Sequence, residues 1–205
     1  MPFTGGIMKK ILILLSNGFE VFEAAAFIDV LGWANVFGNE KIEIVTAGAH
    51  AKLNCTFGFQ IIPDIQIKDL NIEHFDALAI PGGFETAGFY EDGFSEAFLD
   101  LIRHFDEKKK PVASICVGAL LLGKSGILTN RRATTYHLLE GKRRNQLAEM
   151  GAKIIDEPIV VDKNIITSTS PATAAGVAFT LLETLTSKNN AEKIREMMGF
   201  EPGSP

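Results

Sequence analysis

The sequence predicts an α/β fold, a three-layer sandwich in which helices cover both faces of a mostly parallel β-sheet. Short apolar runs with the length of buried strands alternate with longer segments whose apolar residues recur every three to four positions. This alternation continues almost to the C-terminus, with no internal repeat or domain-sized linker. Strands that alternate with helices form right-handed βαβ units, which build such a sheet. A chain of 205 residues is expected to form one domain over residues 1–205.

The first strand and helix are predicted near the N-terminus. Residues 10–16 (KILILLS) form an apolar run typical of a strand buried on both faces, and residues 1–7 before it are expected to be a loose extension. A helix is expected over residues 19–37, ending at Gly38. Its recurring apolar side chains are Phe19, Phe22, Ala26, Val30 and Trp33.

The middle of the chain repeats this pattern. Residues 41–47 alternate as a strand does, and residues 54–67 predict a short hairpin or bent edge strands. Residues 75–80 predict the next strand, and a tight turn follows at Pro81-Gly82-Gly83. An amphipathic helix is expected over residues 93–110, with five side chains facing inward: Phe94, Phe98, Leu101, Ile102 and Phe105.

The remaining elements follow in the same order. Residues 111–115 predict a strand, residues 117–124 a helix, residues 132–135 a short strand and residues 138–150 a helix. Two strands are expected around a turn at residues 162–164, and helices over residues 171–185 and 191–198. Ligands of such sheets bind where loops leave the carboxyl ends of the strands. Three of these loops, after residues 16, 80 and 115, are expected at the same rim.

Composition excludes several classes of function. A net charge of -5 leaves no electrostatic footprint for nucleic acid, and the basic clusters at residues 108–110 and 131–132 are short. No run approaches the roughly 18 apolar residues of a membrane span. Two cysteines cannot build a disulfide framework, and the four histidines lack metal-ligand spacing. We therefore expect a cytoplasmic protein without a metal or other cofactor.

The segment SICVG, after the strand at residues 111–115, resembles a nucleophile elbow. In that motif a small residue lies two positions before and two after the nucleophile, and here Ser114 and Gly118 take these places around Cys116. Unpaired amides at a helix N-terminus favour a thiolate, so we expect a lowered pKa for the Cys116 thiol. The alternative is a buried, inert cysteine.

Two backbone amides and two carboxyl groups are candidate partners of this thiol. The amide of Gly83, in the glycine turn, and that of Val117 are suited to an oxyanion site; a plain loop turn is the alternative.

The position of Glu20 in the first turn of the predicted helix is explained by stabilisation of its carboxylate at the positive end of that helix. Glu23 lies among apolar side chains, and burial beside a thiolate would raise its pKa so that it acts as general acid and base. A surface-exposed Glu23 is the alternative.

A histidine is the usual base for a cysteine nucleophile, and His137 ends the segment TTYH. Successive residues of an extended strand face opposite ways, so either Tyr136 or His137 points at the site. The other three histidines are expected at the surface.

These segments together resemble the DJ-1/PfpI (ThiJ) superfamily along nearly the whole chain. The matching stretches are ILILLSNGFEVFE, FDALAIPGG, KPVASICVGALLLGKSGIL, RRATTYH and VVDKNIITSTSPATAAGVAF. The resemblance implies a flavodoxin-like fold, a homodimer, a reactive cysteine at Cys116 and a partner glutamate at Glu23. It also implies oxyanion-binding amides at Gly83 and Val117.

The chain departs from some branches of that superfamily. The peptidase-like branch has histidine directly after the cysteine, where this chain has Val117, and this argues against proteolysis. Other branches usually place a histidine directly after the two threonines, where this chain has Tyr136, so a catalytic His137 is not supported. The isonitrile-hydratase-like branch tends to have threonine after the cysteine and aspartate in place of Glu23.

The sequence therefore predicts a cysteine-dependent enzyme for a small-molecule substrate, acting on reactive carbonyls as a glyoxalase III does. Cys116 is the expected nucleophile and Glu23 the general acid and base. The main alternative is a non-catalytic redox sensor of the stress response, oxidised at Cys116. An amidase, a peptidase or an isonitrile hydratase is less favoured.

Overall fold

The central feature is a seven-stranded sheet with the order β10-β11-β7-β6-β1-β2-β5. The computed structural model describes residues 8–201, so the expected extension at residues 1–7 lies outside the described range. All neighbouring strands pair in parallel except β10 and β11. The strands are β1 (Lys9–Leu15), β2 (Ile42–Gly48), β5 (Ile65–Gln66), β6 (Ala77–Ile80), β7 (Val112–Ser114), β10 (Ile159–Asp162) and β11 (Ile165–Ser168). This sheet confirms the predicted fold class.

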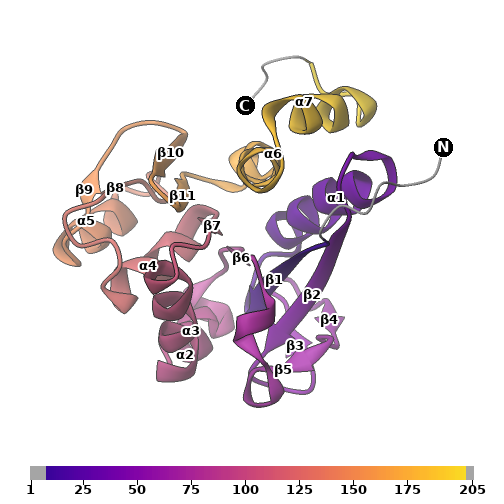
Figure 1. Ribbon diagram of the computed structural model, residues 1–205. Coiled ribbons are helices and arrows are strands. Elements are labelled where there is room, and N and C mark those ends of the chain that lie inside the picture. Colours follow the sequence, from indigo (N-terminus) through magenta and orange to yellow (C-terminus); the bar gives the residue numbers. More distant parts are fainter. Residues whose placement is uncertain (1–7, 202–205) are drawn as a thin grey trace.

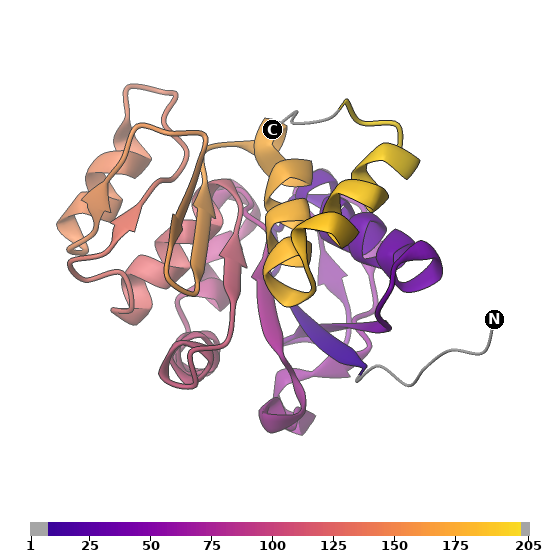
Figure 2. The same cartoon turned by 45° about the horizontal axis from the view of Figure 1, so that its top comes forward.

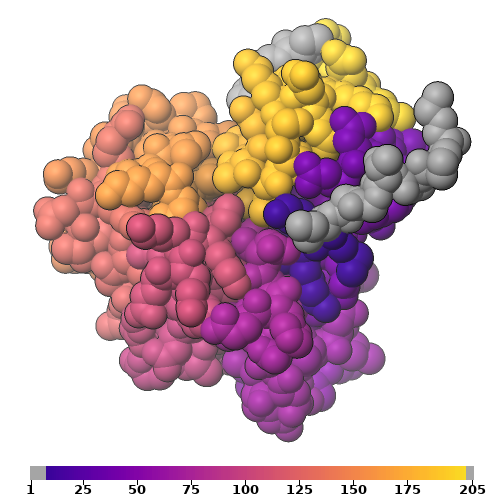
Figure 3. Space-filling model, in the orientation of Figure 1, coloured from indigo at the N-terminus to yellow at the C-terminus, as the bar shows by residue number. Residues whose placement is uncertain are grey.

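Helices cover both faces of the sheet, as Figures 1 and 2 show. One layer consists of α1 (Val21–Phe37), α6 (Ala174–Leu185) and α7 (Lys188–Met197), which pack on one another. In Figure 3 the yellow C-terminal helices lie directly against the purple surface of α1. The opposite layer contains α2 (Phe89–Gly93), α3 (Glu96–Glu107), α4 (Ala119–Ser125) and α5 (Lys142–Glu149).

The strand order creates a switch point next to β1. The chain runs from β1 through α1 to β2 on one side, and later returns to pair β6 with the other side of β1. The loops that leave β1 and β6 therefore diverge at the carboxyl edge of the sheet, where ligands of open α/β sheets bind. Both strands are almost completely buried, as expected for apolar runs covered by helices on both sides.

The orientation of α1 differs from the sequence-based expectation. Its buried face consists of Glu23, Ala24, Phe27, Val30, Leu31 and Ala34. Phe22 is 64% exposed and Trp33 37% exposed, although both belong to the predicted apolar set. The helix is apolar on nearly every side, so its periodicity could not select the buried face, which packing on the sheet determines.

Several predicted helices have different bounds in the structure. The helix expected over residues 93–110 corresponds to α3, which begins at Glu96 after its N-cap Ser95 and ends at Glu107, while the separate helix α2 ends at Gly93. Four of its five expected inward residues, Phe98, Leu101, Ile102 and Phe105, are buried in α3, whereas Phe94 follows α2 and is partly buried. The helix expected from residue 117 begins with a 3₁₀ turn (Cys116–Gly118), and α4 follows only from Ala119. The helix expected from residue 138 begins at Lys142, because residues 139–141 all have positive φ.

Two small sheets lie outside the main one. The expected hairpin is present as β3 (Leu53–Asn54) and β4 (Gln60–Ile61), paired antiparallel. The short strand expected near residue 132 is β8 (Arg132–Ala133), which pairs in parallel with β9 (Lys153–Ile154). Within residues 8–201, no helix has the length and hydrophobicity needed to cross a membrane.

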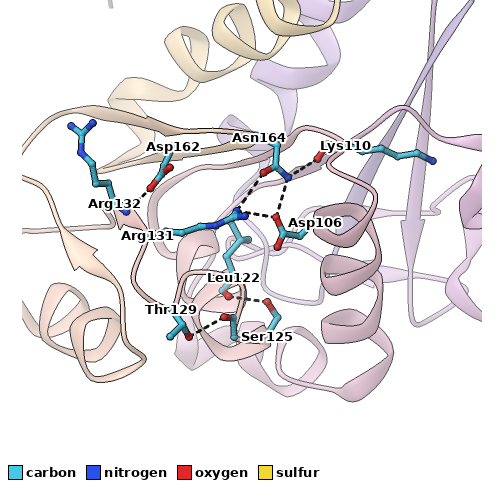
Figure 4. Close-up of polar contacts among 10 residues, drawn as sticks. Asp106, Lys110, Leu122, Ser125, Thr129, Arg131, Arg132, Asp162 and Asn164 are labelled. Atoms are coloured by element: carbon cyan, nitrogen blue, oxygen red, sulfur yellow. Dashed lines mark hydrogen bonds and ion pairs between the residues drawn. The ribbon is translucent and has the colours of Figure 1, made fainter.

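A polar network joins the residues just before the start of β7, β8 and β11 (Figure 4). Arg131 forms an ion pair with Asp106 at 2.8 Å, and both side chains are largely buried. Asn164 donates to Asp106 and to the carbonyl oxygen of Lys110, each at 3.1 Å. The backbone carbonyl oxygen of Asn164 accepts a hydrogen bond from the Val112 amide, so the network fixes the start of β11 against the start of β7.

Asn164→Ala should lower the free energy of unfolding by about 1–3 kcal/mol, because it removes the partly buried donor to the Lys110 carbonyl oxygen and one of the donors to Asp106, which keeps its ion pair with Arg131. Urea denaturation followed by circular dichroism measures this change. Asn189→Ala, at an exposed position of α7, is the matched control and should change stability by less than about 0.5 kcal/mol. Equal effects of the two substitutions would show that the network does not stabilise the fold.

Candidate functional site

Cys116 lies in a strained turn between β7 and α4. Its φ is 53°, a left-handed conformation that residues with a side chain rarely adopt. The turn follows directly from β7, whose last residue is the buried Ser114. Strain of this kind is typical of functional positions and of the nucleophile elbow in particular. The strained strand-to-helix turn that an elbow requires is therefore present at Cys116.

Neighbouring groups hold the elbow in place. A Cβ at Gly118 would come within 3.0 Å of the Ile80 carbonyl oxygen, so the small residue allows the turn to lie against the end of β6. The amide of Ile115 donates to the same carbonyl oxygen at 3.1 Å. Thr135 is completely buried, and its hydroxyl donates to the carbonyl oxygen of Cys116 at 2.8 Å. These contacts offset the strain at Cys116.

Glu23 is completely buried on the inner face of α1. The amide of Gly82 donates to its Oε2 at 2.5 Å, whereas Oε1 has no hydrogen-bond partner that meets geometric criteria among the described residues. A Cβ at Gly82 would lie 2.9 Å from Oε2 and 3.1 Å from the Val117 amide nitrogen. Burial raises the pKa of Glu23 from 4.5 to about 8, although the Gly82 amide and the Cys116 thiol lower it in part. The alternative of a surface-exposed Glu23 is wrong.

The Cys116 thiol faces this carboxyl group and is only 6% exposed. Burial raises the pKa of the thiol, and the charges of Glu23 and Glu20 raise it further, while the Val117 amide lowers it. The expectation of a lowered thiol pKa is therefore wrong for this structure. The physical reason is that α4 has seven residues and begins only after a 3₁₀ turn, so its dipole contributes less than burial and two nearby carboxyl groups.

The Cys116–Glu23 pair is neutral at low pH and loses its first proton from Glu23. With the pKa of Glu23 near 8 and that of the thiol higher, a carboxylate forms first and can accept the thiol proton when an electrophile arrives. The pair thus has the elements of a nucleophile and its base within one buried site.

Gly83 and Val117 both line the cavity that Cys116 also lines, and the Val117 amide acts on the thiol. Gly83 lies in an isolated bridge to Phe19, in which Phe84 donates to the Gly18 carbonyl oxygen at 3.0 Å. The Gly83 amide itself donates to no acceptor among the described residues. A Cβ at position 83 would overlap the Gly18 carbonyl, so glycine is required here. A free amide in the lining of the cavity that Cys116 also lines is suited to bind a developing oxyanion.

The cavity above Cys116 has a volume of about 530 Å³. It opens between the loops that leave β1, β6 and β7 and is closed on the far side by the segment before α5 and the start of α6. Its lining consists of Glu20, Gly83, Phe84, Glu85, Cys116, Val117, Tyr136, Leu138, Leu139, Lys142, Arg143, Ser170, Pro171 and Ala172. This is the rim where the sequence predicted a site.

Of the two alternative residues after the threonines, Tyr136 lines the cavity and His137 does not. The Nδ1 atom of His137 is buried without a hydrogen-bond partner among residues 8–201. Glu20 also lines the cavity, and partial burial raises its pKa. The base available to Cys116 is therefore a carboxyl group rather than an imidazole.

Sequence reasoning missed the contribution of α5 and its preceding loop. Arg143 donates to Glu85 at 2.7 Å, and its guanidinium lies 5.2 Å from the centroid of the Tyr90 ring. Burial raises the pKa of Tyr90. No local pattern relates α2, the turn after β6 and α5, which meet only because the sheet brings them to one edge.

The sequence matches the model of the DJ-1/PfpI family over residues 9–184. An uncharacterized protein of Staphylococcus haemolyticus is 32% identical over 163 residues, which span 80% of this chain and 90% of that protein. The glutathione-independent glyoxalase DJR-1.2 of Caenorhabditis elegans is 28% identical over 178 residues, or 86% and 89% of the two chains. The crystal structure of Drosophila melanogaster DJ-1beta superposes with a TM-score of 0.84 and 26% identity, covering 95% of this chain and all of that one.

The raised pKa of Glu23 makes stability depend on pH. Between pH 4.5 and about 8 the folded chain keeps a proton that the unfolded chain loses, so the free energy of unfolding falls as pH rises, by roughly 1.4 kcal/mol per pH unit. Glu23→Gln removes this term. The stability of the variant relative to the original chain should therefore rise by about 2–3 kcal/mol between pH 5.5 and 7.5, measured by urea denaturation.

Glu91→Gln, which alters an exposed carboxyl group on α2, serves as the control and should show no such change. If Glu23→Gln behaves like this control, the carboxyl group is ionised at ordinary pH and the assigned proton is absent.

Proposed function

The chain belongs to the DJ-1/PfpI family, and from this membership and the Cys116–Glu23 pair we propose that it is a cysteine-dependent enzyme of reactive carbonyls. The reaction is that of a glyoxalase without glutathione, in which an α-oxoaldehyde and water form a 2-hydroxy acid. A similarity to a glyoxalase of Caenorhabditis elegans supports the substrate class. The observation that carries the proposal is the buried Glu23 carboxyl group that faces the thiol.

In the first step the sulfur of Cys116 attacks the aldehyde carbon. A carbon–sulfur bond forms, the carbonyl electron pair moves to oxygen, and the thiol proton passes to the Glu23 carboxylate. The amides of Gly83 and Val117 stabilise the oxyanion as it develops. Glu23 then returns the proton to this oxygen, which gives a hemithioacetal and regenerates the carboxylate.

In the second step Glu23 moves a proton between two carbon atoms. Its carboxylate takes the hydrogen from the former aldehyde carbon as a proton, and the electron pair of that carbon–hydrogen bond moves to the neighbouring ketone group, which gives an enediolate with its negative charge on the former ketone oxygen. Glu23 then protonates the former ketone carbon, and the hydroxyl proton of the hemithioacetal passes to the former ketone oxygen, which leaves a 2-hydroxy thioester on Cys116. Water hydrolyses the thioester, and the thiol and the hydroxy acid are released. A base that ionises near neutral pH is suited to both transfers.

The raised thiol pKa argues against the redox-sensor alternative. Peroxide reacts with the thiolate, and an exposed, easily ionised thiol is the usual site of such oxidation. Cys116 is almost completely buried, and its pKa is raised. Because Glu23 accepts the thiol proton as the sulfur attacks, the arrangement suits a substrate bound in the cavity better than it suits peroxide in solution.

The purified chain should convert methylglyoxal to lactate without glutathione, and Cys116→Ser should lower the rate to background. Glu23→Gln should lower kcat by about 10²- to 10⁴-fold, because it removes the acid and base. In the original chain kcat/KM should rise with pH through an apparent pKa of about 8, as Glu23 ionises. Lactate assays by enzymatic coupling and mass spectrometry measure these rates.

The conversion of Cys55→Ser is the matched control, because Cys55 lies in the hairpin outside the cavity lining. An original chain that turns over no dicarbonyl compound but gains two oxygens at Cys116 under dilute peroxide would overturn the enzyme proposal in favour of the sensor.

We also propose that the chain forms a homodimer and works in the cytoplasm. An exposed apolar patch runs from the start of α1 across the β3–β4 hairpin to Phe84: Val21, Phe22, Phe57, Phe59 and Phe84. Two contacts bring these segments together: the Thr56 amide donates to the Phe19 carbonyl oxygen, and the rings of Phe57 and Phe84 lie 5.6 Å apart. Apolar patches of this kind mark interfaces. Two unpaired, buried cysteines fit a reducing compartment.

Sedimentation velocity should detect a dimer at micromolar concentration. Phe57→Glu should weaken it by about 100-fold or more, because a charge would be buried without a partner. Val161→Glu, on the exposed side of the edge strand β10, is the control and should leave the dimer intact. A monomeric original chain, or equal weakening by both substitutions, would contradict the proposed interface.

A further inference from the structure

We infer that the cavity above Cys116 selects carbonyl compounds that carry an apolar group at least the size of an aromatic ring, over compounds of three carbons. This inference names the substrate class of the site and therefore rests on the proposed function. It is carried by the volume of the cavity, the apolar character of its walls and two leucines at its edge.

The cavity is far larger than a three-carbon dicarbonyl. Its volume of about 530 Å³ lies in the range of pockets that bind ligands of drug size. At the roughly 30 Å³ that a water molecule occupies in the liquid, the three carbons and two oxygens of methylglyoxal would fill at most about 150 Å³. Most of the cavity would then hold water against its walls.

These walls are apolar, so water in them is unfavourable. Six of the lining residues present mainly carbon atoms to the space: Phe84, Val117, Tyr136, Leu138, Leu139 and Pro171. A substrate with an apolar group releases this water and buries both surfaces, which contributes binding free energy in proportion to the area.

The charged residues of the rim do not change this character. Glu85 accepts from Arg143 at 2.7 Å, and its carboxylate lies 3.7 Å from the Lys142 ammonium. Arg143 also donates to Gln146, so its guanidinium is occupied by side chains of the protein. We therefore assign recognition to the apolar walls rather than to an anion site at these cations.

Leu138 and Leu139 have the most exposed large apolar side chains of the cavity lining, so a ligand that covers them would bury apolar surface. They line the cavity and yet are 54% and 78% exposed. The backbone turns sharply from Leu139 onward, since φ is 54° at Leu139, 60° at Glu140 and 71° at Gly141. This conformation is unfavourable for leucine, and it keeps the side chain at the edge of the cavity instead of in the core. Because both leucines line the same cavity as Cys116, an apolar group that fills this cavity would cover them.

Turnover of two α-oxoaldehydes tests the inference. Phenylglyoxal should have a kcat/KM about 10- to 100-fold higher than methylglyoxal, after each is corrected for its reactivity with N-acetylcysteine. In the Leu138→Ser, Leu139→Ser double variant, the ratio of the two kcat/KM values should fall by about tenfold or more. Val36→Ser changes an equally exposed apolar residue of α1 outside the cavity, and it should keep the ratio.

Alkylation of Cys116 gives a second measurement that does not require turnover. Phenacyl bromide and bromoacetone each form a carbon–sulfur bond with the thiol and release bromide and a proton. Mass spectrometry follows both reactions. Relative to free N-acetylcysteine, phenacyl bromide should react about tenfold faster at Cys116 than bromoacetone, and the double leucine variant should lose this preference.

The two measurements separate the inference from the proposed function. Preferential alkylation without turnover of either aldehyde would support the apolar cavity and overturn the proposed reaction. Turnover of both aldehydes with equal corrected kcat/KM and no alkylation preference would overturn the inference and leave the reaction standing. Failure of both bromides to reach Cys116 would also overturn it, because the cavity would then not lead to the thiol.

Discussion

The hydrogen bond from the Gly82 amide to the buried Glu23 carboxyl group is the interaction on which the site depends. It joins α1, which follows the first strand, to the turn that follows β6, and so ties the two loops that diverge at the switch point of the sheet. It also offsets part of the cost of burying an acid, which would otherwise be large. Glycine is required on the donor side, since any Cβ would press on the carboxyl oxygen and on the Val117 amide. Removing this contact would leave the acid without its well-formed hydrogen bond and the turn without its anchor.

Burial of the acid determines the chemistry that the thiol can perform. A carboxyl group with a pKa of about 8 is half ionised at a pH where an exposed glutamate has long lost its proton. The thiol beside it is harder to ionise than a free cysteine, because it shares the same dry space and two nearby carboxyl groups. Nucleophile activation is therefore coupled to proton transfer within the pair, and the strained elbow at Cys116 holds the sulfur in the position this coupling requires.

The scaffold and the substrate cavity are built in different ways. β1, β6 and β7 and their turns are fixed by strand pairing, close backbone packing and the Thr135 contact, so the reacting atoms are held rigidly. The far side of the cavity above them is formed by the loop before α5 and by the start of α6. In the loop before α5, consecutive residues adopt left-handed conformations and two leucines remain exposed. Loops on a rigid sheet can differ in shape without disturbing the nucleophile.

The sequence alone determined the fold class, the order of most strands and helices, the turn at Cys116 and three of the loops that line the cavity, because buried strands, helical periodicity and turn glycines are local patterns. Tertiary structure alone decided which face of the apolar helix α1 is buried, and hence that Glu23 meets the thiol while Phe22 remains exposed. It also decided the direction of the thiol pKa, the choice of Tyr136 over His137, and the part played by Leu139 and Arg143. These depend on distances between segments remote in sequence and on the depth at which each group lies, and no local pattern encodes either quantity.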